Sequence, residues 1–197
     1  MTVADKPSLL TRLVLSVLLG VFRLQGWTLT GKAPAARKCV LVGAPHTSNW
    51  DFIFFLGATH AFGLRPAFMG KHSLFRWPLR RFMVEMGGLP VIRSASHNYV
   101  DQMVAAFESH DDLMLVVAPE GTRKGAERWK SGFYHIAHGA GVPIVPAWVD
   151  HANRRGGLGD EIVTTGDYAA DLARIAEFYR SVLPGHSRLE AITPDRS

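Results

Sequence analysis

Short apolar runs alternate with longer segments of helical periodicity along most of the chain. The runs predict strands at residues 39–44, 66–70, 89–92, 113–118, 144–149 and 161–165. The intervening segments predict helices at residues 50–62, 75–86, 98–109, 132–139 and 168–183. Strands rich in Val, Ile and Leu and separated by helices favour a mostly parallel sheet with helices on both faces. We therefore expect a single-domain α/β fold.

The N-terminal segment has a different pattern. Residues 13–22 are almost continuously apolar and are bracketed by Arg12 and Arg23. This run is shorter than the roughly 20 residues that a helix needs to cross a bilayer. No small-residue cleavage site of a signal peptide stands out after it. We interpret it as a helix at a membrane interface, with a helix packed on the protein's own core as the alternative. Residues 1–32 then form this helix and a linker, and residues 33–197 form the main domain.

The composition says more about the compartment and the partners of the protein than about its fold. The 197 residues are 47% hydrophobic, which suffices for one well-packed core. The single cysteine, Cys39, cannot form an internal disulfide, so a reducing compartment fits best. The formal net charge of +5 predicts attraction to anionic partners without identifying them.

The basic residues are concentrated in two groups. The first group lies within the first forty residues and contains Lys6, Arg12, Arg23, Lys32, Arg37 and Lys38. The second mixes Lys71, Arg76, Arg80 and Arg81 with Phe75, Trp77 and Phe82. Basic and large apolar side chains together suit the headgroup region of an anionic bilayer. Nucleic acid is the competing partner, but no nucleic-acid-binding module is recognisable. We expect an anionic membrane surface as partner, at the cytoplasmic face of the cell membrane, and no nucleic acid.

A histidine and an aspartate follow the first predicted strand of the main domain. His46 lies in the turn after it, and Asp51 lies in the first turn of the next predicted helix, with Ser48 or Asn49 as N-cap. The helix dipole favours an ionised carboxylate at Asp51. A carboxylate bound to one ring nitrogen leaves the other free to accept a proton. The pair predicts a base and its orienting partner, although an isolated pattern of this kind is more often a turn residue and a helix-end carboxylate.

A second polar element, Pro119-Glu-Gly-Thr-Arg123, also follows a predicted strand. Gly121 permits a tight turn, while the hydroxyl of Thr122 and the guanidinium of Arg123 can bind an anion. A solvated charged loop is the alternative. Because ligands collect beyond the carboxyl ends of parallel strands, His46 and this loop are expected at one site.

Other candidate residues give weaker signals. Lys71 follows one predicted strand and Arg93 closes another, so both could reach the same crevice or lie on the surface. His135 and His138 are three residues apart on a predicted helix, but no third metal ligand is close in sequence, so no metal site is expected. No Walker loop, dinucleotide fingerprint or Gly-x-Ser-x-Gly motif is present.

Taken in order, these elements resemble the glycerolipid acyltransferase family typified by 1-acylglycerol-3-phosphate O-acyltransferase. The family's His-x4-Asp block is matched by His46 and Asp51, and its Phe-Pro-Glu-Gly-Thr-Arg block by residues 119–123. A looser Gly-x-x-x-x-Arg block corresponds to residues 88–93, and a fourth block to residues 142–146. The resemblance covers roughly residues 40–150, and it implies the glycerolphosphate acyltransferase fold.

The resemblance also implies a reaction. His46 would be the general base on an acceptor hydroxyl, oriented by Asp51, and the co-substrate would be an acyl-CoA or the acyl form of an acyl-carrier protein (acyl-ACP). Arg123, with Arg93 and Lys71, would hold the phosphate or other anionic headgroup of a lysolipid acceptor. Glu120 and Gly121 would shape that loop. No metal or redox cofactor is implied.

The chain departs from the family pattern at several positions. Pro45 replaces the usual Asn before the histidine, Ala118 replaces Phe, and Lys124 replaces a frequent Ser. These changes leave the acceptor open to an aminoacyl lysolipid, a glycolipid or a soluble alcohol. A non-catalytic lipid-binding protein and a hydrolase that activates water through His46 are further alternatives.

Overall fold

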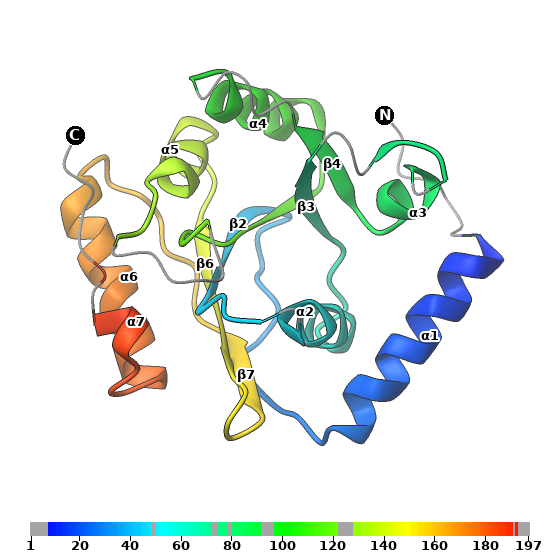
Figure 1. Ribbon diagram of the computed structural model, residues 1–197. Helices are drawn as coiled ribbons and strands as arrows, with labels where there is room; N and C mark the ends of the chain where they lie inside the picture. Colours follow the sequence, from blue (N-terminus) through cyan, green and yellow to red (C-terminus); the bar gives the residue numbers. More distant parts are fainter. Residues whose placement is uncertain are drawn as a thin grey trace.

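The computed structural model describes residues 8–48, 50–71, 75–78, 80–91, 97–121, 128–190 and 192. Its strands form one seven-stranded sheet in the order β1-β7-β6-β2-β5-β3-β4 (Figure 1). The strand bounds are β1 Thr28–Thr30, β2 Lys38–Ala44, β3 Pro66–Lys71, β4 Gly88–Val91, β5 Leu113–Val117, β6 Ile144–Asp150 and β7 Arg155–Leu158. The helix bounds are α1 Leu9–Leu24, α2 Trp50–Ala61, α3 Arg80–Glu85, α4 His97–Ser109, α5 Gly132–Gly139, α6 Tyr168–Val182 and α7 Ser187–Glu190.

The sheet is parallel except where β6 pairs with β7. The central strand β2 lies between β5 and β6, with Val42 beside Val117 and Ala44 beside Trp148. Parallel neighbours end at the same edge of a sheet. The segments that follow β2, β5 and β6 therefore leave that edge side by side, which brings distant parts of the sequence to one place.

The two faces of the sheet are covered by different helices. Val40 and Val42 of β2 belong to the main core, which packs against α4, α5 and α6, whereas Leu41 points to the opposite face. On that face α2 packs over the sheet (Figure 1). Its Phe54 belongs to one buried cluster with Val149 of β6. The predicted α/β architecture with helices on both faces is confirmed.

Helix α1 packs on α2 at one end and is tethered at the other. A Cβ placed at Gly57 of α2 would lie 2.1 Å from Cγ of Phe22, so only glycine allows this close packing. At the N-terminus, Ser8 and Thr11 donate to the carboxylate of Glu85 on α3. The hydroxyl of Thr11 and the guanidinium of Arg81 are the largest causes that lower the pKa of Glu85 to about 2. The carboxylate of Glu85 therefore keeps its charge at neutral pH.

One side of α1 is exposed and apolar. Its exposed large apolar residues are Leu9, Leu10, Leu13, Val17 and Leu24. Among the described residues, no helix combines the length and the apolar character needed to cross a membrane.

Most predicted elements match the structure to within a few residues, with three exceptions. The strand predicted at residues 161–165 is wrong, since only Ile162 forms a bridge, to Ile144. Beyond it, the N–H of Thr165 donates to the carboxylate of Asp171 instead of to a strand. The helix predicted at residues 75–86 is shorter, Arg80–Glu85, because Pro78 interrupts it and disfavours helix in the preceding residue.

The third exception is a set of elements that the sequence pattern did not predict, namely β1, β7 and the short helix α7. β7 contains Gly156 and Gly157, which are poor strand formers. A Cβ at Gly157 would lie 2.1 Å from the carbonyl oxygen of Thr30, so the close approach of β1 requires glycine. The boundary after Lys32 stays a prediction, although β1, which precedes it, is hydrogen-bonded within the sheet.

Candidate functional site

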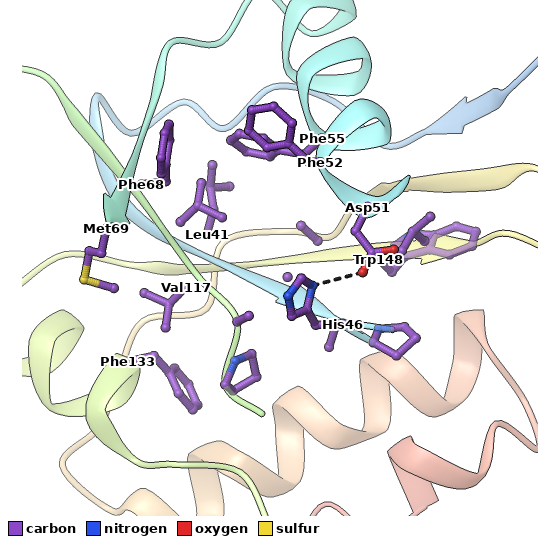
Figure 2. A pocket seen from close by; sticks show the side chains of 18 of the residues that line it. Leu41, His46, Asp51, Phe52, Phe55, Phe68, Met69, Val117, Phe133 and Trp148 are labelled. Carbon is purple, nitrogen blue, oxygen red and sulfur yellow. Dashed lines mark ion pairs between the residues drawn. The ribbon is translucent and has the colours of Figure 1, made fainter. Parts of the chain in front are cut away.

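His46 lies in the short segment that connects β2 to α2, and its ring contacts Asp51. The distance from His46 Nδ1 to Asp51 Oδ2 is 2.9 Å, and Figure 2 shows this pair beside a pocket. Asp51 lies in the first turn of α2, and the hydroxyl of Ser48 accepts from the N–H of Trp50. The predicted contact between the histidine and the carboxylate is therefore present. With Nδ1 engaged, Nε2 is the nitrogen left to exchange a proton with a substrate.

The carboxylate of Asp51 accepts hydrogen bonds on both oxygens. Oδ2 also accepts from the N–H groups of Thr47 and Ser48, at 2.8 and 2.9 Å, and Oδ1 accepts from Nε2 of His151 at 2.5 Å. Burial disfavours the charged form, but the bonds from His151, His46, Ser48 and Thr47 outweigh it and hold the pKa of Asp51 well below its usual range. Asp51 is therefore a permanent anion beside His46 at neutral pH.

Glu120 holds the backbone of His46. Its side chain is 2% exposed, and Oε1 accepts from the N–H of His46 at 2.8 Å. The guanidinium of Arg188 on α7 donates to Oε2 of Glu120 at 3.1 Å and to the carbonyl oxygen of His46 at 3.0 Å. Glu120 and Arg188 thus fix the segment that carries the histidine from both sides, while the ring itself stays accessible.

Gly121 has the backbone conformation expected of a tight turn. Its φ angle is +64°, and its N–H donates to the carbonyl oxygen of Ala118. A side chain here would be strained because L residues rarely adopt this φ. Gly121 and Lys130 both line the pocket.

The remaining predicted anion-binding residues are placed only in part. Lys71 is the last residue of β3, where its backbone is paired with Val91 of β4. Arg93, Thr122 and Arg123 lie outside the described residues. Their role in binding an anionic group stays a prediction.

A large pocket lies beside His46, between α2 and the carboxyl-terminal part of the sheet. Its volume is about 1060 Å³. Most of its lining is aliphatic or aromatic, including Leu41, Phe55, Phe68, Val117 and Phe133 (Figure 2). Among the described residues that line it, Lys130 is the only lysine or arginine. An apolar cavity with one histidine–carboxylate pair at its wall suits a ligand with a long apolar part and one reacting polar group.

The two histidines considered for a metal are engaged otherwise. His138 Nδ1 lies 3.0 Å from the hydroxyl of Thr164, and the ring of His135 stacks on Tyr168. Within the described ranges, no group of three or more His, Cys, Asp or Glu side chains is arranged to hold a metal ion.

Sequence reasoning missed two residues of the site, His151 and Arg188. His151 directly follows β6, so the same strand-end rule that indicated His46 could have found it. Arg188 lies 142 residues from His46 on a short helix, and nothing in the local pattern indicates its partners.

The chain is similar to known proteins at the level of a family model, of sequence and of structure. The sequence model of the family described as Acyltransferase matches residues 27–150. A 1-acyl-sn-glycerol-3-phosphate acyltransferase of Haemophilus influenzae is 30% identical over 110 residues, which cover 51% of this chain and 43% of that protein. The chain therefore matches less than half the length of this relative.

A solved structure is also similar to this chain. The crystal structure of the 1-acyl-sn-glycerophosphate (LPA) acyltransferase PlsC from Thermotoga maritima aligns with a TM-score of 0.57. The alignment covers 87% of this chain and 77% of that one, at 18% sequence identity. At this identity the likeness shows a shared fold.

Proposed function

The chain belongs to the acyltransferase family, and from this premise we propose that it transfers a fatty acyl group from an acyl thioester to the hydroxyl of a lysophospholipid such as 1-acylglycerol 3-phosphate. The observation that carries the proposal is the 2.9 Å contact between His46 Nδ1 and Asp51 Oδ2 at the wall of a large apolar pocket. The name of the Haemophilus influenzae relative supports the choice of acceptor.

The proposed reaction uses His46 as base and then as acid. Nε2 of His46 takes the proton of the acceptor hydroxyl, and the oxygen attacks the thioester carbonyl carbon. Asp51 stabilises the imidazolium that forms. The tetrahedral intermediate collapses by breaking the carbon–sulfur bond, and the imidazolium returns the proton to the leaving thiolate. The products are the acylated lipid and the free thiol of the donor, either coenzyme A or acyl-carrier protein.

The pocket is proposed to hold the acyl chain. Its lining of aromatic and aliphatic side chains from α2, β3 and β5 offers an apolar environment with few polar groups. The anionic group of the acceptor is proposed to bind near Lys130 and Gly121, together with the predicted Lys71, Arg93, Thr122 and Arg123. No metal or redox cofactor enters this proposed reaction.

An acyl-transfer assay tests the proposal. The purified protein is incubated with labelled acyl-CoA or acyl-ACP and a panel of lysolipids, and the products are separated by chromatography. We expect labelled diacyl product with 1-acylglycerol 3-phosphate. Transfer only to an aminoacyl lysolipid, a glycolipid or a soluble alcohol would show that one of these compounds is the acceptor. Release of free fatty acid in excess of transfer would show that the protein is a hydrolase. Lack of any transfer would contradict the proposed activity.

The exposed face of α1 supports a location on the membrane. We propose that Leu10, Leu13 and Val17 enter the interface while Arg12 and Arg23 contact anionic headgroups at the cytoplasmic face. The pocket would then lie near the surface where lysolipids reside.

Replacing Leu10 and Leu13 together with glutamate should lower binding to vesicles that contain phosphatidylglycerol by more than about 100-fold. Burial of each leucine contributes about 1.5–3 kcal/mol, and the new carboxylates are repelled by the anionic lipid. Sedimentation with vesicles measures the binding. Val163→Glu is the matched control, because Val163 is an exposed apolar residue that lies far from α1 in the sequence. Equal binding by the double variant and the wild type would contradict this role of α1.

A further inference from the structure

A second histidine shares the carboxylate of Asp51. His151 lies in the turn after β6, and His46 lies in the segment after β2, the strand paired with β6. The parallel pairing therefore brings the two histidines to the same sheet edge, although His151 is 100 residues from Asp51. His151 is not among the residues that line the pocket, and its polar contact with the site is the one with Asp51.

The hydrogen bonds of Asp51 divide unevenly between its two oxygens. Oδ2 accepts from His46 and from two backbone N–H groups, whereas His151 is the only donor to Oδ1 among the described residues. The side chain of Asp51 is 11% exposed, so solvent reaches its carboxylate poorly. A nearly buried carboxylate oxygen without a donor is unfavourable, and the carboxylate would rotate or shift to satisfy it.

The ring of His151 is itself held in place. Trp27 packs against it edge to face, with the ring centroids 5.4 Å apart, and Nε1 of Trp27 donates to the side chain of Gln25 at 2.8 Å. This packing directs Nε2 of His151 at Asp51. Donation to the carboxylate requires a hydrogen on Nε2.

We propose that His151 is a positioning residue for the acyl transfer proposed above, on which this inference rests. It holds Oδ1 of Asp51 so that Oδ2 stays directed at Nδ1 of His46. The imidazole of His46 thereby keeps one tautomer and one orientation, with Nε2 directed at the substrate.

Two substitutions separate the hydrogen bond from the packing. His151→Phe keeps a ring against Trp27 but removes the donor, and His151→Gln keeps an N–H donor near the position of Nε2. We expect His151→Phe to lower kcat about tenfold with KM for the acyl donor unchanged, by analogy with the partners that orient metal-bound histidines, whose loss typically costs about 10–100-fold. His151→Gln should recover most of the loss. Equal losses in both variants, or a change in KM alone, would overturn the proposal.

A measurement independent of activity keeps this inference apart from the proposed function. Nuclear magnetic resonance of the protein with 15N-labelled histidine reports the exchange of the Nδ1 hydrogen of His46 with water. Exchange should be faster in His151→Phe than in the wild type and slow again in His151→Gln. Unchanged exchange in His151→Phe would overturn the positioning role even if the protein transfers acyl groups. If the wild type transfers no acyl groups, the proposed function fails. The exchange rates still test whether His151 positions His46 through Asp51.

Discussion

Replacing His46 with alanine should lower kcat/KM for acyl transfer by about a thousandfold while leaving the protein folded. A positioned base contributes about 10²–10⁴-fold to the rate, and the described residues offer no second base in contact with Asp51 at the pocket wall. The fold should persist because Glu120 and Arg188 bind the backbone of residue 46 and not its ring. Asp51 would also keep its bonds from Thr47, Ser48 and His151. Initial rates and thermal unfolding measure the two effects.

His60→Ala is the matched control for this substitution. His60 is an exposed histidine in the last turn of α2, the helix that carries Asp51 in its first turn. The His60→Ala variant should transfer acyl groups at the rate of the wild type. A rate for His46→Ala within a few-fold of the wild type, in a protein that transfers at all, would remove His46 from the chemistry. Unfolding of His46→Ala would instead contradict the expectation that the fold depends on the backbone contacts of residue 46 and not on its ring.

The local part of this site could be predicted from the sequence. His46 and Asp51 are five residues apart at the junction of an apolar run and a helical segment, so turn geometry and the helix N-terminus bring them together. The joint position of His46 and Glu120 follows from a single rule about the ends of parallel strands. That rule needs only the order of strands and helices, which the apolar pattern provides.

The long-range part could not be predicted in the same way. Arg188 reaches His46 from a four-residue helix, and its partners depend on how α6 and α7 fold back over the sheet. Glu120 was expected to shape a substrate-binding loop, whereas in the structure its carboxylate bonds the backbone of His46. A single sequence carries no signal that separates a buried glutamate from an exposed one within a charged loop.

Replacing Arg188 with leucine should lower the free energy of unfolding by about 3 kcal/mol, because it leaves a nearly buried carboxylate at Glu120 without its cation. For a chain of this size the loss corresponds to a decrease in Tm of about 6–12 °C. Activity should fall as well, since the carbonyl of His46 loses the guanidinium that holds it. Chemical denaturation and calorimetry measure the stability. Arg180→Leu, at an exposed position of α6, is the matched control and should unfold like the wild type.

The double variant Arg188→Leu with Glu120→Gln tests whether charge is the cause. The amide oxygen of glutamine can still accept from the N–H of His46, and no uncompensated charge remains in the interior, so most of the lost stability should return. Removing both members of a buried pair is far less costly than removing one. A double variant as unstable as Arg188→Leu would show that α7 stabilises the site through packing. If stability recovers but kcat does not, activity depends on the hydrogen bond from Arg188 to the carbonyl oxygen of His46. Glutamine at position 120 does not restore that bond.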